Sequence, residues 1–371
     1  MENPRNITDL PLEVLDQIFG YLSYLSSKVK LAQAHEKLGK AFVYHSRNEF
    51  RRLSPDAYLT PELWLFVVKE CGATVEELFY DDERPGFYWD DLIAQAVVKH
   101  CPNLKSVSTC VYRSQHDSVQ EFLIKTKNSL ISLSLKLSQH FTHCTLMNVV
   151  GEMPQLKKLS IIGFVDEQIY QVQKLISLET LKIEELYYRS RQELDILRIC
   201  SSLKNLRKLK VSNIKLKPIK ERCSIMWADL EYLKLTQSEV TSELPDCPKL
   251  KYLDIRNLTC HIEGYILKFI KKNGANIHTI CEKCYPLITA DGFLQLLRSC
   301  PNLRVLYTQL EYIKLYFAYV TNMVEILREN GVTPGDPLEL VVCSRIKWKW
   351  IKRLLLRTPN SELIDLYMGT F

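Results

Sequence analysis

Basic side chains gather in the middle of this 371-residue chain, where they could bind an anion. The residues that we expect to contact a ligand are Lys158, Lys182, Lys208, Lys210, Lys234, Tyr252 and Arg256. Like charges on neighbouring strands repel each other slightly. A surface that keeps such charges together therefore favours an acidic or phosphorylated ligand. The alternative is an ordinary solvated strand face, because charge runs arise easily in soluble proteins.

A second group of residues has part of the pattern of a zinc site. Cys281 and Cys284 have the spacing of one half of such a site, and Cys260 and His261 precede them. A structural zinc site needs a second properly spaced pair of ligands. The chain offers no such pair, so we expect no metal and no cofactor.

Catalytic patterns are missing from the sequence. There is no Gly-x-Gly-x-x-Gly or Walker-type loop to hold a phosphate, and no Gly-x-Ser-x-Gly nucleophile elbow. The eight histidines are scattered along the chain. We therefore expect a protein that is not an enzyme but positions another molecule.

A repeated phrase, Leu-x-x-Leu-x-Leu, must position the basic residues. Its clearest copies begin at Leu156, Leu178, Leu206, Leu230 and Leu250, and looser copies begin at Val75, Leu104, Leu130, Ile277 and Leu303. Consecutive copies start 20 to 29 residues apart, by subtraction of these numbers. This period is typical of repeats with one strand and one helix per unit. Positions 1, 4 and 6 should point into a shared core, and positions 3, 5 and 7 should point out from the strands.

The repeats resemble the leucine-rich repeat, and residues 287–306 resemble its cysteine-containing class, which is frequently joined to F-boxes. The resemblance implies an α/β solenoid, a horseshoe with parallel strands on its concave face. We expect the repeats over residues 74–310, and divergent repeats with a cap over residues 311–371. Helices are expected near 89–100, 119–125, 146–152, 167–175, 192–199, 265–272, 292–298, 323–329 and 346–357.

The first 53 residues lack the phrase and have a helical period instead. Leu15, Ile18, Phe19 and Leu22 form one apolar stripe by the i, i+3, i+4, i+7 rule. Pro11 suits the first turn of a helix. Two further helices should follow, and residues 54–73 should form a linker and the first helix of the solenoid.

The residues that carry a second resemblance are Ile7-Thr-Asp-Leu-Pro-Leu-Glu-Val-Leu-Asp-Gln-Ile-Phe-Gly-Tyr-Leu22. This stretch resembles an F-box, the motif that binds the Skp-type adaptor of a cullin-RING ubiquitin ligase. By position, the implied adaptor-facing residues are Leu10, Pro11, Leu12, Val14, Leu15, Ile18, Phe19 and Leu22. The family usually has a Trp in its second half, whereas no Trp lies between Leu31 and Phe50.

The two resemblances together predict a substrate-recognition subunit of an SCF-type ubiquitin ligase, whose repeats bind the protein to be ubiquitinated. One alternative is a leucine-rich-repeat scaffold whose N-terminal helices only cap the solenoid. A nucleic-acid binder is disfavoured, because aromatic residues do not alternate with the lysines.

Composition is consistent with this prediction. The net charge is +6, 46 % of the residues are hydrophobic, and no apolar run approaches the length of a membrane span. The N-terminus lacks a signal region, so twelve cysteines suggest reduced thiols and a cytoplasmic or nuclear location. We expect neither nucleic acid nor membrane as a partner.

Overall fold

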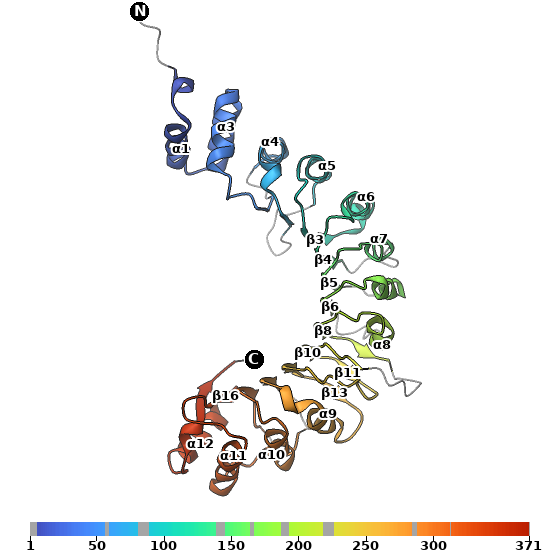
Figure 1. Ribbon diagram of the computed structural model, residues 1–371, viewed down its shortest axis with the longest axis vertical. Coiled ribbons are helices and arrows are strands. Elements are labelled where there is room, and N and C mark those ends of the chain that lie inside the picture. The colour runs from blue at the N-terminus through green and yellow to red at the C-terminus, as the bar shows by residue number, and fades with distance from the viewer. Residues whose placement is uncertain are drawn as a thin grey trace, which may run out of the picture. The chain divides into compact units, whose positions relative to one another are not determined.

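The computed structural model describes residues 6–55, 59–80, 89–138, 145–163, 167–186, 193–217, 226–283, 288–311 and 313–370. The chain forms two compact units, Met1–Gln171 and Val172–Phe371. Both are built from parallel strands that alternate with helices (Figure 1). Within the described ranges, no helix combines the length and hydropathy needed to cross a membrane.

The first unit begins with a helical segment, which consists of the 3-10 turn Ile7–Asp9 and helices α1 (Leu12–Tyr21), α2 (Leu25–Gln33) and α3 (Glu36–His45). The ring of Phe19 on α1 lies 5.9 Å from the ring of Phe42 on α3. A polar chain also joins the helices, because the His45 ring lies 2.6 Å from the Asp16 carboxylate and 2.8 Å from Lys28 Nζ. Aromatic packing and these polar contacts together hold the three helices as one group.

Five parallel strands follow in the first unit. They are β1 (Arg52–Leu53), β2 (Glu77–Phe79), β3 (Ser106–Val111), β4 (Ser132–Leu137) and β5 (Lys158–Gly163), and they pair in that order. The helices between them are α4 (Pro61–Cys71), α5 (Asp91–His100), α6 (His116–Thr126) and α7 (Leu146–Val150). A 3-10 helix, Glu167–Lys174, spans the boundary between the two units.

The second unit contributes eight parallel strands, which makes thirteen within the described parts of the chain. They are β6 (Thr180–Glu184), β8 (Lys208–Ser212), β10 (Tyr232–Thr236), β12 (Tyr252–Asp254), β14 (Thr279–Cys281), β15 (Val305–Thr308), β16 (Leu338–Val342) and β17 (Ile364–Met368). The helices are α8 (Ile196–Cys200), α9 (Tyr265–Asn273), α10 (Ala290–Ser299), α11 (Phe317–Glu329) and α12 (Arg345–Leu355). A second sheet contains β7 (Glu193–Leu194), β9 (Lys215–Leu216), β11 (Glu239–Val240) and β13 (Thr259–Cys260).

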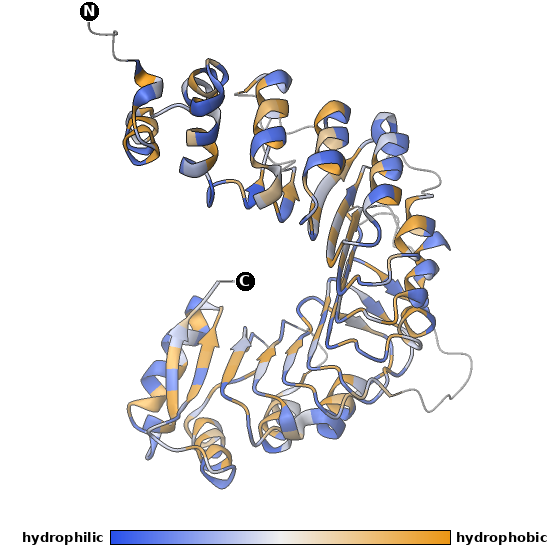
Figure 2. Ribbon diagram, turned by 45° about the horizontal axis from the view of Figure 1, so that its top comes forward, coloured by the Kyte–Doolittle hydropathy of each residue, from blue (hydrophilic) through white to orange (hydrophobic). Residues whose placement is uncertain are grey.

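The strand register confirms the leucine-rich-repeat solenoid that the phrase predicts. Every one of the ten phrases has a strand that begins at its third position, and that position pairs across strands, as in Lys208 with Tyr232. The fourth position points inward, so that Leu209, Leu233 and Leu253 are fully buried. Each such leucine contributes up to about 2–3 kcal/mol of hydrophobic stabilisation. The strands show the resulting alternation of hydrophobic and hydrophilic residues (Figure 2).

Asparagines also connect successive repeats, a role that the phrase alone did not reveal. Four of them stand immediately before a phrase and donate a side-chain N–H to a carbonyl of the previous repeat. These are Asn103 to Ala73, Asn205 to Ile176, Asn276 to Pro248 and Asn302 to Ala275, at 2.7 to 3.0 Å. Because each repeat contacts only its neighbours, these bonds fix the spacing from one unit to the next.

Three expectations need correction. The parallel strands begin one strand earlier than predicted, with β1, which pairs with β2. The phrase could not predict β1, because this strand has only two residues and lies outside any copy of the phrase. The helix near 167–175 is a 3-10 helix, Glu167–Lys174. Short strands of the second sheet follow β6, β8, β10 and β12, and one of them, β7, takes the place of the start of the helix expected near 192–199, which begins at Ile196. Between β10 and β12 the chain has no helix, because that interval is too short for one.

Candidate functional site

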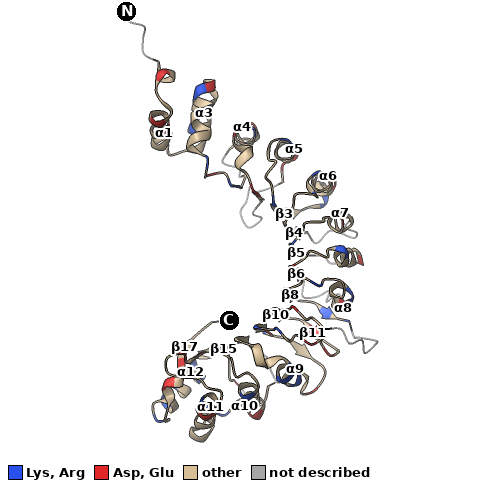
Figure 3. Cartoon of the chain, viewed as in Figure 1, with Lys and Arg blue, Asp and Glu red and all other residues tan. Residues whose placement is uncertain are grey.

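The structure brings most of the predicted ligand-binding residues together on the strands of the second unit. Lys182, Lys210 and Lys234 lie side by side on β6, β8 and β10. Lys208 lies two residues before Lys210 on β8. Tyr252 lies two residues before Asp254, the partner of Lys234 on β12, and Arg256 follows β12. Lys and Arg residues mark this part of the sheet in Figure 3. We call Lys182, Lys210 and Lys234 the lysine row. Lys158 lies on β5 of the first unit, where it is exposed.

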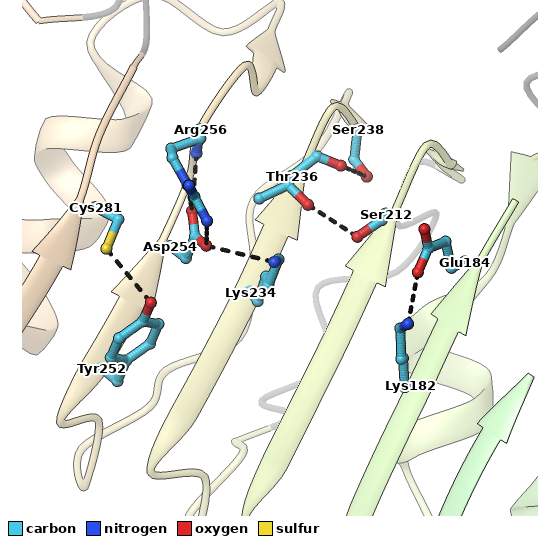
Figure 4. Close-up of polar contacts among 10 residues, drawn as sticks. All are labelled: Lys182, Glu184, Ser212, Lys234, Thr236, Ser238, Tyr252, Asp254, Arg256 and Cys281. Carbon is cyan, nitrogen blue, oxygen red and sulfur yellow. Dashed lines mark hydrogen bonds and ion pairs between the residues drawn. The ribbon is translucent and has the colours of Figure 1, made fainter. Parts of the chain in front are cut away.

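Two carboxylates on this face hold the outer lysines of the row (Figure 4). Lys182 Nζ lies 2.7 Å from an oxygen of Glu184, and Lys234 Nζ lies 3.7 Å from an oxygen of Asp254. The Asp254 carboxylate is fully buried and accepts two hydrogen bonds from the Arg256 guanidinium, at 2.8 and 2.9 Å. Such a two-point pair is the strong form of the interaction. The sequence did not predict these pairings.

Lys210, at the centre of the row, differs from its two neighbours. No carboxylate among the described residues lies within ion-pair distance of its ammonium group. Burial lowers the pKa of Lys210, and the charges of Lys234, Lys182 and Lys208 lower it further. The positive charge of Lys210 is therefore less well compensated in the folded protein than the charges of Lys182 and Lys234.

Two tyrosines border the row. The rings of Tyr232 and Tyr252 stack with their centroids 4.1 Å apart and their planes 4° apart. Lys210 Nζ lies 5.2 Å from the centroid of Tyr232, within the range of a cation–π contact. Burial raises the pKa of both phenol groups, so both stay protonated at neutral pH. The tyrosines thus form a flat neutral surface beside the cationic row.

Two hydroxyl groups lie on the other side of the row. Ser212 Oγ and Thr236 Oγ1 are 2.8 Å apart on β8 and β10 (Figure 4). Each follows a lysine of the row by two residues, so it points to the same side of the sheet. The two hydroxyls hydrogen-bond to each other, and both residues are buried, each at 8 % exposure.

The N-terminal helices divide the predicted adaptor-facing residues into three sets. Leu15 and Phe19 are fully buried between the helices, so they form the core of this segment rather than its surface. Leu12 and Val14 are exposed, at 36 % and 38 %, and so is Pro11. The remaining three, Leu10, Ile18 and Leu22, are half-buried.

The same helices expose two tyrosines that sequence reasoning did not single out. Tyr21 is 86 % exposed and Tyr24 is 74 % exposed. Val14, Ile18 and Tyr21 follow the i, i+4, i+7 rule and therefore share one face of α1. This face is an outward apolar surface next to the buried stripe, whereas Leu12, at the start of α1, lies on the other side of the helix. Leu15 and Phe19 are offset from Val14 and Ile18 by one residue, so the spacing distinguishes two faces of α1, and the packing of α2 and α3 decides which face is buried.

The half zinc pattern does not develop into a visible site. No group of three or more potential metal ligands occurs among the described residues, and Cys284 lies outside them. Burial raises the pKa of the Cys281 thiol and of the Cys260 thiol.

Comparisons with known proteins agree with the fold. No family model matches the chain, and no curated protein matches it. A chain in the crystal structure of the Rad7 and Elc1 complex in yeast is similar, with a TM-score of 0.53 and 16 % identity. The match covers 89 % of this chain and 88 % of that one. The leucine-rich-repeat ectodomain of the receptor kinase GASSHO1/SCHENGEN3 from Arabidopsis thaliana has a TM-score of 0.42 and 12 % identity, over 84 % and 40 % of the two chains.

The chain is thus a leucine-rich-repeat solenoid with helices before its repeats, a fold that serves protein interaction.

Proposed function

We propose that this protein is the substrate-recognition subunit of an SCF-type ubiquitin ligase. In this proposal the N-terminal helices bind a Skp-type adaptor and, through it, a cullin-RING ligase. The repeats bind the protein that is to be ubiquitinated and degraded. The chain itself performs no catalysis; it brings a substrate close to the catalytic subunits, which is a proximity effect.

The observation that carries the proposal is the outward apolar face of α1. Val14 and Tyr21 are exposed large hydrophobic residues on one side of this short helix, with the half-buried Ile18 between them. An exposed apolar cluster of this kind marks a surface for another protein. The F-box resemblance of residues 7–22 supports an adaptor as that protein. The similar solved chain is part of a two-protein complex, which is consistent with a protein partner.

The test is co-purification of the full chain with a Skp-type adaptor and a cullin. Val14→Asp and Tyr21→Asp place a charge on the exposed face without entering the core, so we expect both variants to fold and to lose the adaptor. Gln33→Asp, an exposed change at the end of α2, is the matched control and should keep it. Leu15→Asp is unsuitable, because it would bury an unpaired charge and unfold the helices.

The second candidate function is a leucine-rich-repeat scaffold without a role in ubiquitination. The observation that favours it is the missing Trp between Leu31 and Phe50. A folded native chain that captures no adaptor would establish this second function and overturn the first. In both cases we place the protein in the cytoplasm or nucleus, with a protein ligand, acidic or phosphorylated, on the strands.

A further inference from the structure

We propose that the lysine row binds the phosphate group of a phosphorylated protein segment, with Lys210 as its central contact. This inference rests on the proposed role of the strands in protein recognition. It does not depend on the adaptor, because the lysine row belongs to the second unit and the adaptor surface to the first. The two proposals can therefore fail separately.

The geometry provides three cationic groups in a line. Lys182, Lys210 and Lys234 are direct cross-strand partners on three consecutive parallel strands. Neighbouring strands lie about 4.8 Å apart, and long flexible lysine stems can converge over that distance. A phosphate monoester presents three acceptor oxygens. Each oxygen can accept from a different strand, an arrangement that a planar carboxylate with two oxygens cannot match.

The charge balance also favours a dianion. Five cations lie on this face, counting Lys208 and Arg256 with the row, against the two carboxylates of Glu184 and Asp254. Both carboxylates are already paired, with Lys182 and Arg256 respectively. The face therefore has a net charge of about +3 by this count. A phosphate monoester, with about two negative charges at neutral pH, offsets most of it.

An anion has the most favourable electrostatic interaction with the lysine row when it lies next to Lys210. Lys182 and Lys234 are already engaged by carboxylates, whereas the ammonium group of Lys210 has only cationic neighbours and the Tyr232 ring within the described residues. An anion at Lys210 relieves the repulsion between it and both neighbours. The hydroxyl pair Ser212–Thr236 lies two residues further along β8 and β10, on the same side of the sheet.

The stacked tyrosines suggest how the rest of the segment lies. Tyr232 and Tyr252 form a flat surface next to the phosphate position, over β10 and β12. Such a surface accepts an apolar or aromatic side chain of the bound segment. The binding surface thus combines one charged position with one apolar position. Because only the charged position needs the phosphate, phosphorylation of the segment would control its binding.

The experiment uses the full chain and N-acetyl-O-phosphoserine amide as the probe, observed by phosphorus NMR line broadening. The native chain should broaden the signal, and an excess of inorganic phosphate should restore it. Lys210→Gln should abolish the broadening, and Lys210→Arg should retain it. Lys204→Gln, an exposed change in the turn before β8, is the matched control and should behave as the native chain.

The pH dependence provides a second readout. The second ionisation of a phosphate monoester has a pKa of about 6, so binding should strengthen about threefold or more between about pH 5 and about pH 7. N-acetyl-aspartate amide, a carboxylate probe, should compete at least tenfold less well.

Unchanged broadening with Lys210→Gln, or equal competition by the carboxylate probe, would overturn the inference. Adaptor capture is measured on the same variants. If the native chain binds phosphate but captures no adaptor, only the ubiquitin-ligase proposal is overturned.

Discussion

Replacing Lys210 with Met should make the folded protein more stable. The substitution keeps a side chain of similar length and removes the charge. The pKa of Lys210 is lowered in the folded protein, chiefly by burial and then by three cationic neighbours. The charged form is therefore less favourable in the folded chain than in the unfolded chain, where the pKa is ordinary. At neutral pH the charge of Lys210 therefore lowers the free energy of unfolding. Lys210→Met has no such charge, so its free energy of unfolding should be higher.

The size of the effect follows from the spacing of the charges. Two ammonium groups about 6 Å apart in water repel each other by about 0.7 kcal/mol. At physiological salt, with a Debye length of about 8 Å, roughly half of that remains. Three lysine neighbours then give a gain of about 1 kcal/mol for Lys210→Met, and about 2 kcal/mol when the salt is low. The partial exposure of Lys210 keeps the effect this small.

Urea denaturation of the native chain and the variant, followed by tryptophan fluorescence, measures the difference. We expect the midpoint of Lys210→Met to be higher at about 20 mM salt, and the gap to shrink at about 500 mM salt. The gap should also shrink as the pH rises through the lowered pKa, since Lys210 then loses its charge in the folded chain. Lys204→Met is the control and should leave the midpoint unchanged. The electrostatic reasoning is refuted if the variant is less stable than the native chain, or if the difference in urea midpoint does not change with salt concentration.

Three further substitutions test other parts of the structure. Asp254→Asn removes the buried carboxylate that holds Arg256 and should lower the free energy of unfolding by about 1–3 kcal/mol, measured by urea denaturation. Gly163→Ala should cost at least about 1–2 kcal/mol and lower the melting temperature, because the backbone φ is +110° and the added carbon would overlap the carbonyl oxygen of Leu137. Asn302→Ala should cost about 1 kcal/mol and speed hydrogen exchange in the preceding turn, since a carbonyl loses its donor.

The phrase was sufficient to predict the strands and their register. Each copy of the phrase has the same pattern of buried and exposed positions. If the buried positions of all copies form one continuous core, equivalent positions of successive strands must pair with each other. The pattern could not reveal β1, because two residues are too few to show alternation. It also could not predict the second sheet, whose strands are equally short.

The candidate site was predictable only in outline. Position 5 of three phrases placed Lys182, Lys210 and Lys234 on one row, which the pairing confirms. Which of them lacks a carboxylate depends on the side-chain conformations of Glu184 and Asp254, and spacing carries no information about those. On α1, the apolar stripe was visible in the sequence. Its division into a buried and an exposed face depends on how α2 and α3 pack against it.

The second sheet has a consequence for how a partner can lie on the strands. A helix is about 10 Å wide and neighbouring strands are about 4.8 Å apart, so a repeat with a helix behind its strand spreads more at the back than at the front. This wedge bends a solenoid. Between β10 and β12 the chain has only the short strand β11 behind the sheet, and β11 pairs with β9 and β13 at the same close spacing. Between these two repeats the back layer therefore spreads less than it does where a helix stands behind each strand. An extended peptide can follow the surface of β10 and β12 with less bending than it would need beside repeats that have a helix behind each strand.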